Sequence, residues 1–498
     1  MRKIHTYLGR LLAVLTVSVL AVACSKSGDS VEQKVADYVS ADADMAWTID
    51  FERLFAATGT TVADDGTVRY SDYANSLMGA MPDYLKRRMD VFARNPFMKW
   101  NNAVGTTWTD GAEVSLVVWS VTDADDFARH LADNEGWTAG SESGYATATP
   151  DGSGAVVARD GLAFVVLKGT TAVDARTAVQ TVEAARERAK SHPAADWQHR
   201  ELEHGDMLAA LMSMAKLKDT GLMAKAMDLM GDKDKFTDAT MAVRLDVDGG
   251  KATLGTELLK NADGTALPLE WGAPIDPAML RLLPAGTCEM AALGNFKTLL
   301  MTGGRLDEST RTMTDNFTGQ VMLGFSLSKA ALAEALSTPS PDNVAFTVLF
   351  QCKPGCAKAA LRDVCSILGH VSESSDESAT IEFVYGTKRN PAVDDYWADN
   401  YYIDAVARIT CRVEGDVLAI TNQPKADGPA PFAAELVKGH AMAFGVNEPK
   451  DSEIMKTLGT GFGLKVNAYA EGGKFRLEAE VTDTDKGFVE AIAAMIGK

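Results

Sequence analysis

Apolar residues along the chain follow two patterns, a short alternating pattern typical of strands and a longer one with helical spacing. Residues 114–121 and 344–351 are apolar runs of strand length, and each is followed by a segment with helical spacing. Short apolar runs also flank Asp-Gly, Gly-Asp or Gly-Gly pairs, which predicts antiparallel hairpins. These hairpins are expected at residues 156–164, 409–418, 247–254 and 470–477. Hairpins combined with helices predict the α+β class, with antiparallel sheets.

The same patterns occur twice, in the same order. The run Val247-Asp248-Gly249-Gly250-Lys251 recurs as Ala470-Glu471-Gly472-Gly473-Lys474. A second match joins residues 39–55 to residues 283–300. Each segment consists of a few residues that precede a strand, the strand itself and the helix that follows it. Four matches in order indicate two tandem, diverged copies of one antiparallel-sheet-plus-helices domain, at residues 33–270 and 271–498.

The two expected copies differ in their insertions. The first copy has helical spacing over residues 174–191 and 206–230, whereas the second has a long loop over residues 387–404. Differences between copies are where specialised function is expected, because shared positions mostly serve the fold. The methionines of residues 206–230 alternate with leucines at helical spacing, which favours core packing over a partner-binding groove. They are Met207, Met212, Met214, Met223, Met227 and Met230.

The first 24 residues have the pattern of a lipoprotein export signal. Basic residues come first, residues 11–20 are apolar, and Ala21-Val22-Ala23 precedes Cys24. The apolar run is shorter than the roughly 20 residues that a membrane-spanning helix needs. We therefore expect a signal peptide at residues 1–23, lipid on Cys24 and a polar tether at residues 24–32. The lipid makes a membrane the first expected partner.

Charge and size narrow the classes of function further. The chain has 498 residues with 49 basic and 68 acidic side chains, and removal of residues 1–23 leaves 46 against 68, a net charge of −22. An acidic body is repelled by phosphate backbones, so nucleic acid is not an expected partner. The length is too great for one hydrophobic core, which agrees with two domains.

The layout resembles a family of uncharacterised Bacteroidales lipoproteins, the domain of unknown function 4836. The resemblance rests on Cys24, on the opening Ala41-Asp42-Ala43 with the helix of Phe51 and Leu54, and on the second opening Leu283-Pro284-Ala285. Ser40 stands where the family usually has proline. The resemblance implies this architecture and a place in the cell envelope, at the outer membrane. It implies no chemistry, because the family carries no established activity.

The loop of the second copy holds the strongest candidate for ligand binding. Aromatic rings stack on sugar rings, while Asp and Asn side chains hydrogen-bond to hydroxyl groups, and long loops carry function more often than other segments. The candidate ligand-binding residues are Asp395, Trp397, Asp399, Asn400 and Tyr401. The alternative is a structural loop whose aromatic side chains pack over the sheet.

Catalytic and metal-binding patterns are weak throughout the sequence. Residues 191–205 are expected to connect two elements of secondary structure. The spacing of His192, His199 and His204 within this segment fits no zinc pattern. Cys352 and Cys356 resemble half of a metal knuckle without its second half. Five cysteines follow Cys24, so at least one is unpaired, and Cys352 and Cys411 are candidates for cross-strand neighbours. We expect no metal, no cofactor and no catalytic residue.

These observations favour a lipid-anchored envelope protein with a non-catalytic binding or structural role, whose partner is a glycan or a protein. One alternative is a hydrolase acting on glycans, which requires two carboxyl groups in a cleft and a raised pKa on one of them. Another is a subunit of an outer-membrane assembly, which requires a broad apolar patch.

Overall fold

The chain forms two compact units. The first unit comprises the described residues from 37 to 267 together with residues 484–496, and the second comprises those from 273 to 483. The computed structural model describes residues 37–79, 83–110, 112–150, 154–169, 171–217, 236–267, 273–283, 289–294, 315–327, 344–368, 370–390, 392–393, 402–423, 436–437, 439–471 and 473–496.

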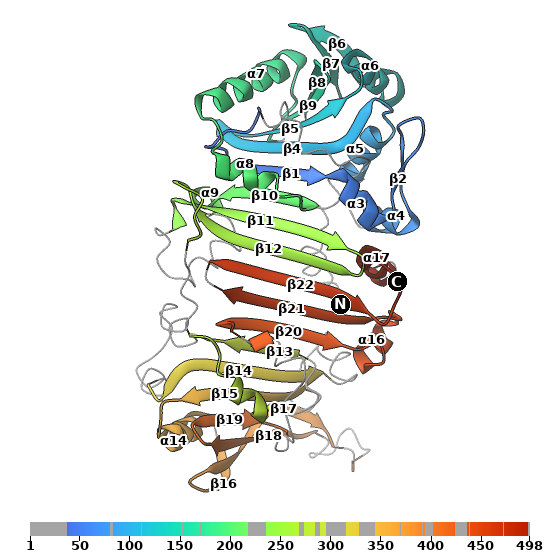
Figure 1. Ribbon diagram of the computed structural model, residues 1–498. Helices are drawn as coiled ribbons and strands as arrows, with labels where there is room; N and C mark the ends of the chain where they lie inside the picture. The colour runs from blue at the N-terminus through green and yellow to red at the C-terminus, as the bar shows by residue number, and fades with distance from the viewer. Residues whose placement is uncertain are drawn as a thin grey trace. The chain divides into compact units, whose positions relative to one another are not determined.

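The first unit is built on an antiparallel sheet whose described part has ten strands (Figure 1). In space the strands follow the order β12-β11-β10-β1-β4-β5-β9-β8-β7-β6. Their bounds are β1 Met45–Asp50, β4 Met98–Asp110, β5 Ala112–Val121, β6 Thr138–Glu142, β7 Tyr145–Thr149, β8 Ala155–Arg159, β9 Leu162–Lys168, β10 Leu208–Ser213, β11 Ala239–Asp248 and β12 Lys251–Lys260. A separate small hairpin joins β2 (Thr61–Val62) to β3 (Val68–Arg69).

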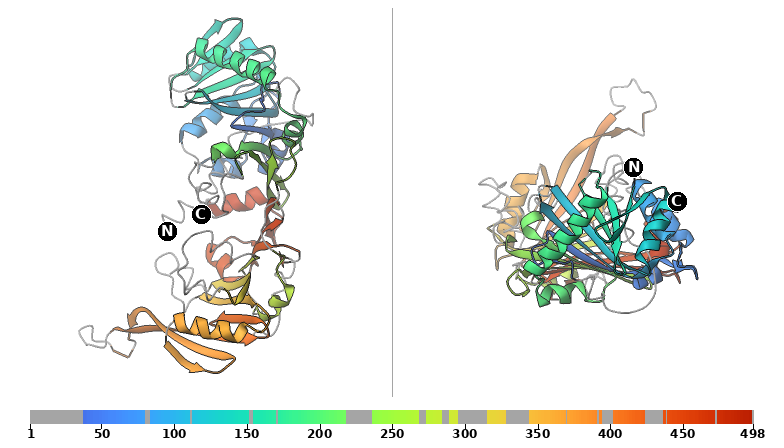
Figure 2. Two further views of the ribbon diagram at one scale, coloured as in Figure 1. Left: turned by 90° about the vertical axis from the view of Figure 1, so that its left-hand side faces the viewer. Right: turned by 90° about the horizontal axis from the view of Figure 1, so that it is seen from above.

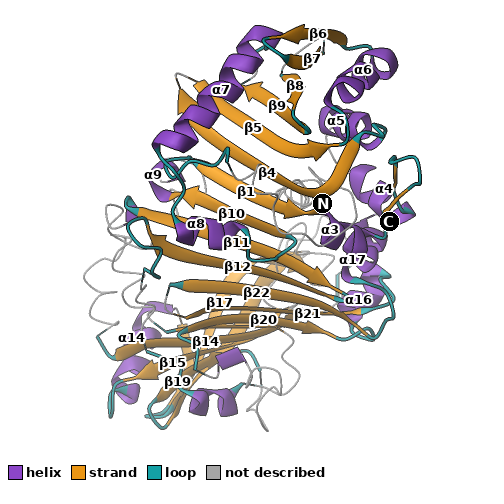
Figure 3. Ribbon diagram, turned by 45° about the horizontal axis from the view of Figure 1, so that its top comes forward, coloured by secondary structure: helices purple, strands orange, loops and turns teal. Residues whose placement is uncertain are grey.

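Helices cover both faces of this sheet (Figure 3). Helix α7 (Ala175–Ser191) and helix α8 (Asp196–Leu202) pack on the face that carries Leu116 and Phe164. Helix α3 (Phe51–Thr58) and helix α6 (Ala124–Glu135) pack on the other face, against Trp119 and Val121. Burial of both faces explains why β5 and β9 are almost continuously apolar. The remaining helices are α4 Asp72–Gly79, α5 Asp83–Ala93, α9 Met214–Leu217 and α17 Phe488–Ile496.

Aspartate side chains cap the N-termini of three helices of the first unit, α3, α6 and α7. Asp50, Asp123 and Asp174 each accept a hydrogen bond from the backbone N–H three residues later, at 3.1, 2.8 and 2.7 Å. Such caps satisfy an N–H group that the helix itself leaves free, and their negative charge suits a helix N-terminus. Helix α7 confirms the helix expected over residues 174–191.

One expected helix is wrong over residues 208–213, although residues 214–217 of the same range form the short helix α9. The helix predicted for residues 206–230 starts instead as β10, which pairs with β1 on one side and β11 on the other. Two complete ladders of hydrogen bonds outweigh the local helical spacing of the methionines. Met207 and Met214 are buried, as expected of core residues. Residues 218–235, which contain Met223, Met227 and Met230, lie outside the described residues.

The second unit is also built on an antiparallel sheet of ten described strands. Their order is β22-β21-β20-β13-β14-β15-β19-β18-β17-β16. The bounds are β13 Glu289–Leu293, β14 Phe317–Leu327, β15 Val344–Cys352, β16 His370–Ser374, β17 Ser378–Arg389, β18 Tyr402–Glu414, β19 Val417–Thr421, β20 Met442–Glu448, β21 Gly463–Glu471 and β22 Lys474–Thr482. The described helices are η2 Pro277–Leu282, α14 Ala357–Leu368 and α16 Glu453–Leu458.

Taken in chain order, the ten strands of each sheet occupy the same series of places. The first strand, β1 or β13, lies between the second and the eighth, and the third strand pairs with the seventh. The helix after the third strand, α6 or α14, covers the same face in both units. Each unit is therefore a mixed structure of a mainly antiparallel sheet with helices, as the α+β prediction requires.

The last helix of the chain belongs to the first unit. In α17, Val489 and Ala493 pack against Leu77 and Met78 of α4, and the Phe488 N–H donates to the carbonyl oxygen of Gly249 at 2.8 Å. The first unit is thus completed by residues that follow the second unit in the sequence.

Candidate functional site

The residues predicted for lipidation and for ligand binding lie outside the described residues. They are Cys24, Asp395, Trp397, Asp399, Asn400 and Tyr401. The strands that carry the predicted loop are described, however, and they correct its limits. The loop expected at residues 387–404 is shorter, because Thr387, Lys388 and Arg389 pair with Asp404, Ile403 and Tyr402 as parts of β17 and β18.

The β17–β18 hairpin is much longer than its counterpart in the first unit. Strands β17 and β18 have 12 and 13 residues, whereas the corresponding β7 and β8 have 5 each. Figure 2 shows this hairpin reaching beyond the rest of the sheet of the second unit. We call the part formed by residues 383–389 and 402–409 the arm. It carries the candidate ligand-binding residues between its two strands.

The arm exposes apolar side chains next to an ion pair. Val384 and Val406 stand directly opposite each other and are 58% and 38% exposed. Two residues along each strand, the Arg408 Nε donates to the Glu382 Oε1 at 2.6 Å. An exposed cross-strand pair of valines beside charged groups is a surface suited to contact with another molecule.

The base of the arm is held by a buried cluster under α14. Ile381 and Ile409 form the cross-strand pair at this level, and both are buried together with Cys411 and Leu361. Burial raises the pKa of the Cys411 thiol to about 12. The thiol is therefore neutral at ordinary pH, which suits a side chain that packs in the core.

The cysteine pairing considered from the sequence is wrong. Strand β19 lies between β15, which carries Cys352, and β18, which carries Cys411. These two cysteines are therefore not cross-strand neighbours, and both are free thiols.

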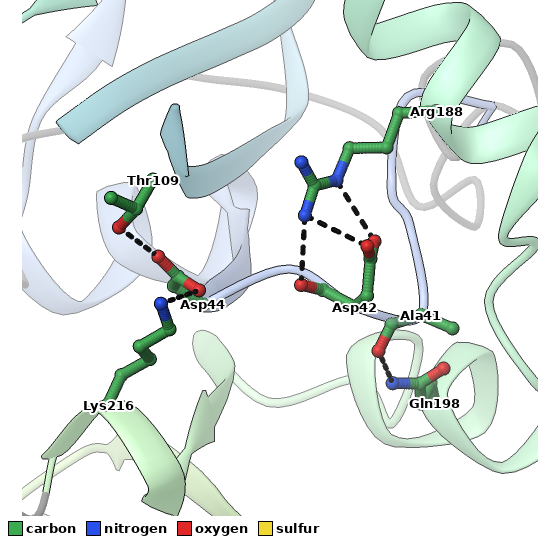
Figure 4. Close-up of polar contacts among 7 residues, drawn as sticks. All are labelled: Ala41, Asp42, Asp44, Thr109, Arg188, Gln198 and Lys216. Carbon is green, nitrogen blue, oxygen red and sulfur yellow. Dashed lines mark hydrogen bonds and ion pairs between the residues drawn. The ribbon is translucent and has the colours of Figure 1, made fainter. Parts of the chain in front are cut away.

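A second well-formed polar site holds the segment that leads into β1. In this lead segment, residues 37–44, Asp42 accepts two hydrogen bonds from Arg188 of α7, at 3.0 and 2.9 Å. Gln198 of α8 donates to the carbonyl oxygen of Ala41 at 3.2 Å (Figure 4). The two-pronged geometry of the guanidinium fixes direction as well as distance.

Asp44 extends the same anchor toward the sheet. Its side chain accepts a hydrogen bond from Thr109 at 2.6 Å and lies 3.5 Å from the Lys216 ammonium (Figure 4). On the buried side, Tyr38 and Val39 pack in the core of the first unit. The lead segment is therefore fixed to the first unit by polar contacts on one side and by core packing on the other.

The Asp42–Arg188 pair predicts a dependence of stability on pH. Burial is the largest single effect and raises the pKa of Asp42. The hydrogen bonds from Arg188 and Ser40, together with the positive charge of Arg188, outweigh it, so the net pKa lies below the usual value. A lowered folded-state pKa adds stability above the unfolded pKa, and this stability is lost as the pH falls through the folded value. We expect urea unfolding at pH 7 and pH 3 to show a smaller acid loss for Asp42→Asn than for the unaltered chain. The difference is about 0.5–1 kcal/mol, because Asp42 is 42% exposed. An equal acid loss in both proteins would contradict this role.

The resolved pKa shifts of the carboxyl groups run opposite to the shift that a glycosidase needs for its general acid. Among the described residues, every resolved carboxyl shift is downward, at Asp42, Asp65, Asp174, Glu183 and Asp263. The pKa of Glu183 is lowered chiefly by the hydrogen bond from the Tyr145 hydroxyl, at 2.6 Å. A general acid at neutral pH needs a raised pKa.

The histidines and cysteines do not gather into a metal site in the described part of the chain. The connector expected at residues 191–205 contains α8, which carries His199. His192 ends α7, and the ring of His204 contacts Asp206 at 2.9 Å. None of the helices in the described ranges combines the length and the apolar composition needed to cross a membrane.

No protein-family model matches the sequence, and no curated protein matches it. Two solved structures are similar in part, crystal forms I and III of TP0453. The first covers 45% of this chain and 76% of that chain at 10% identity, with a TM-score of 0.26. The second covers 47% and 80% at 10% identity, with a TM-score of 0.28. TM-scores this low carry no argument about function.

Proposed function

We propose that the protein is a lipid-anchored binding protein of the cell envelope, held at the outer membrane through Cys24. In this proposal its body consists of two diverged copies of one α+β domain, and the second copy presents the arm to a glycan or protein ligand. The proposed role is binding rather than catalysis.

The duplication is supported by both topology and sequence. Ten strands in the same spatial order are unlikely to arise twice independently, and the matched runs fall on equivalent hairpins. The turn at Gly249 and Gly250 joins β11 to β12, and the turn before Lys474 joins β21 to β22 at the same register. Leu283 and Val39 likewise stand before the first strand of each sheet and are buried in its core.

The observation that carries the binding proposal is the lengthening of one hairpin in only one of two otherwise similar sheets. Extra strand residues that leave the core gain little stability from burial, so the fold alone does not explain them. In the sequence, the candidate residues lie between these two lengthened strands.

The test is a binding screen of the full-length chain in detergent against glycans, peptides and envelope proteins. A shortened variant replaces residues 388–403 by Asn-Gly, which fits the two-residue turn between the paired Thr387 and Asp404. We expect this variant and Trp397→Ala to lose affinity at least tenfold, whereas Phe444→Ala keeps it. Phe444 is a suitable control because it is 38% exposed and lies on β20, outside the arm.

The same preparations report on the anchor. Labelled palmitate should enter the unaltered chain and Cys356→Ser, and it should not enter Cys24→Ser. Binding that survives shortening of the arm would overturn the binding site, and label in Cys24→Ser would overturn the anchor.

A further inference from the structure

The arm has one strand edge without a neighbour in the described part of the chain. Strand β18 pairs with β17 from Tyr402 to Arg412, but β19 joins its other edge only from Thr410 to Glu414. In the first unit, β9 pairs with β8 over all five of its residues, so this open edge is special to the arm. Open edges present backbone N–H and C=O groups that accept a further strand.

The sequence along this open edge is complementary to itself. In the run Ile403-Asp404-Ala405-Val406-Ala407-Arg408-Ile409, isoleucines and alanines stand symmetrically about Val406. The acidic residue 404 occupies the place that mirrors the basic residue 408. When two such strands run antiparallel with Val406 opposite Val406, each Asp404 stands opposite an Arg408. Opposite charges at directly facing positions stabilise antiparallel pairs, and like charges destabilise them.

The described side chains at this edge are free to make these contacts. Val406 is 38% exposed, and pairing would cover it with its own copy. Arg408 contacts Glu382 through Nε, and its side chain remains 76% exposed. A guanidinium has five N–H donors in a fork, so Arg408 can also meet a carboxylate from a second chain.

We propose that two copies of this chain associate through their β18 edges, antiparallel, with a two-fold axis at Val406. The product is a four-stranded ribbon in the order β17-β18-β18-β17, and its interface is isologous, because each copy offers the same residues. This association depends neither on the lipid anchor nor on a ligand. Confinement to one membrane would strengthen it by raising the effective concentration.

Cysteine crosslinking in membranes that contain the full-length chain tests the axis. Val406→Cys places two thiols on facing residues, where Cα atoms are roughly 4.5–5.5 Å apart, within disulfide range. Val384→Cys is the matched control, because it is more exposed but lies on β17, about 14 Å from its copy across three strand spacings. We expect a strong oxidant-dependent dimer band for Val406→Cys and almost none for Val384→Cys or the unaltered chain. No band for Val406→Cys, or an equally strong one for Val384→Cys, would overturn the proposal.

Charge exchange tests the register, with the detergent-solubilised full-length chain followed by sedimentation. Asp404→Arg and Arg408→Asp each place like charges opposite one another twice, so we expect the dimer dissociation constant to rise about tenfold or more. The double variant restores opposite charges and should recover dimerisation. Single variants that dimerise like the unaltered chain would contradict this register, as would a double variant that is folded but monomeric.

Discussion

Val489→Asp should destabilise the first unit strongly, although residue 489 follows the second unit in the sequence. Val489 is 8% exposed and packs with Ala493 against Leu77 and Met78 of α4. A carboxylate at this position loses its water without gaining a partner, and the expected cost is about 3 kcal/mol or more. Hydrogen exchange should show faster exchange in peptides from α4 and α3.

The matched control for this variant is Lys486→Gln, three residues earlier. Lys486 lies 3.4 Å from Glu490, and the two side chains are 48% and 39% exposed. An exposed pair four residues apart contributes about 0.5 kcal/mol or less. A similar loss of stability in both variants would show that the packing of α17 on α4 is not what stabilises the first unit.

This contact also shows where sequence analysis reaches its limit. The apolar spacing of residues 488–496 indicates a helix, but nothing in it identifies the surface on which the helix packs. A repeat boundary drawn at residue 271 follows the order of the matched motifs. Compactness in space is a separate property. It assigns α17 to the first unit, where Val489 and Ala493 pack against Leu77 and Met78.

The sequence predicted hairpins and strands well where one or both faces of the sheet are buried. It failed at β10, where Leu208 and Leu211 have helical spacing but their backbone is fixed by two neighbouring strands. Ladders between residues far apart in sequence leave no local signal when the apolar residues fit both periods.

The arm was missed for a related reason. Residues 387–389 and 402–404 carry mixed polar and aromatic side chains and lack the alternation of a strand that covers a core. Their pairing continues the ladder that contains Ile381 and Ile409, with a one-residue register shift between Val384 and Gly386. The anchor of the lead segment was missed as well, because Arg188, which binds Asp42, and Gln198, which binds Ala41, are more than a hundred residues away.

Ile381→Ala should weaken the arm at its base by about 2–5 kcal/mol, the range found when a buried isoleucine is reduced to alanine. Ile381 is fully buried opposite Ile409 under α14. Truncation leaves a cavity that α14 cannot close without losing its own contacts. We expect hydrogen exchange throughout β17 and β18 to accelerate and the urea midpoint of the second unit to fall.

Val384→Ala in the same hairpin is the natural comparison, because Val384 also stands opposite a branched residue but is 58% exposed. It should cost about 0.5 kcal/mol or less, since little buried surface is lost. The two truncations to alanine therefore distinguish a residue that anchors the arm from one that forms its exposed face. Ile381→Ala should reduce ligand binding and dimerisation together with stability. Val384→Ala can alter only contacts made by the exposed face. If both variants left the stability of the second unit unchanged, the cluster under α14 would not anchor the arm. Neither proposal could then rely on a firmly held arm.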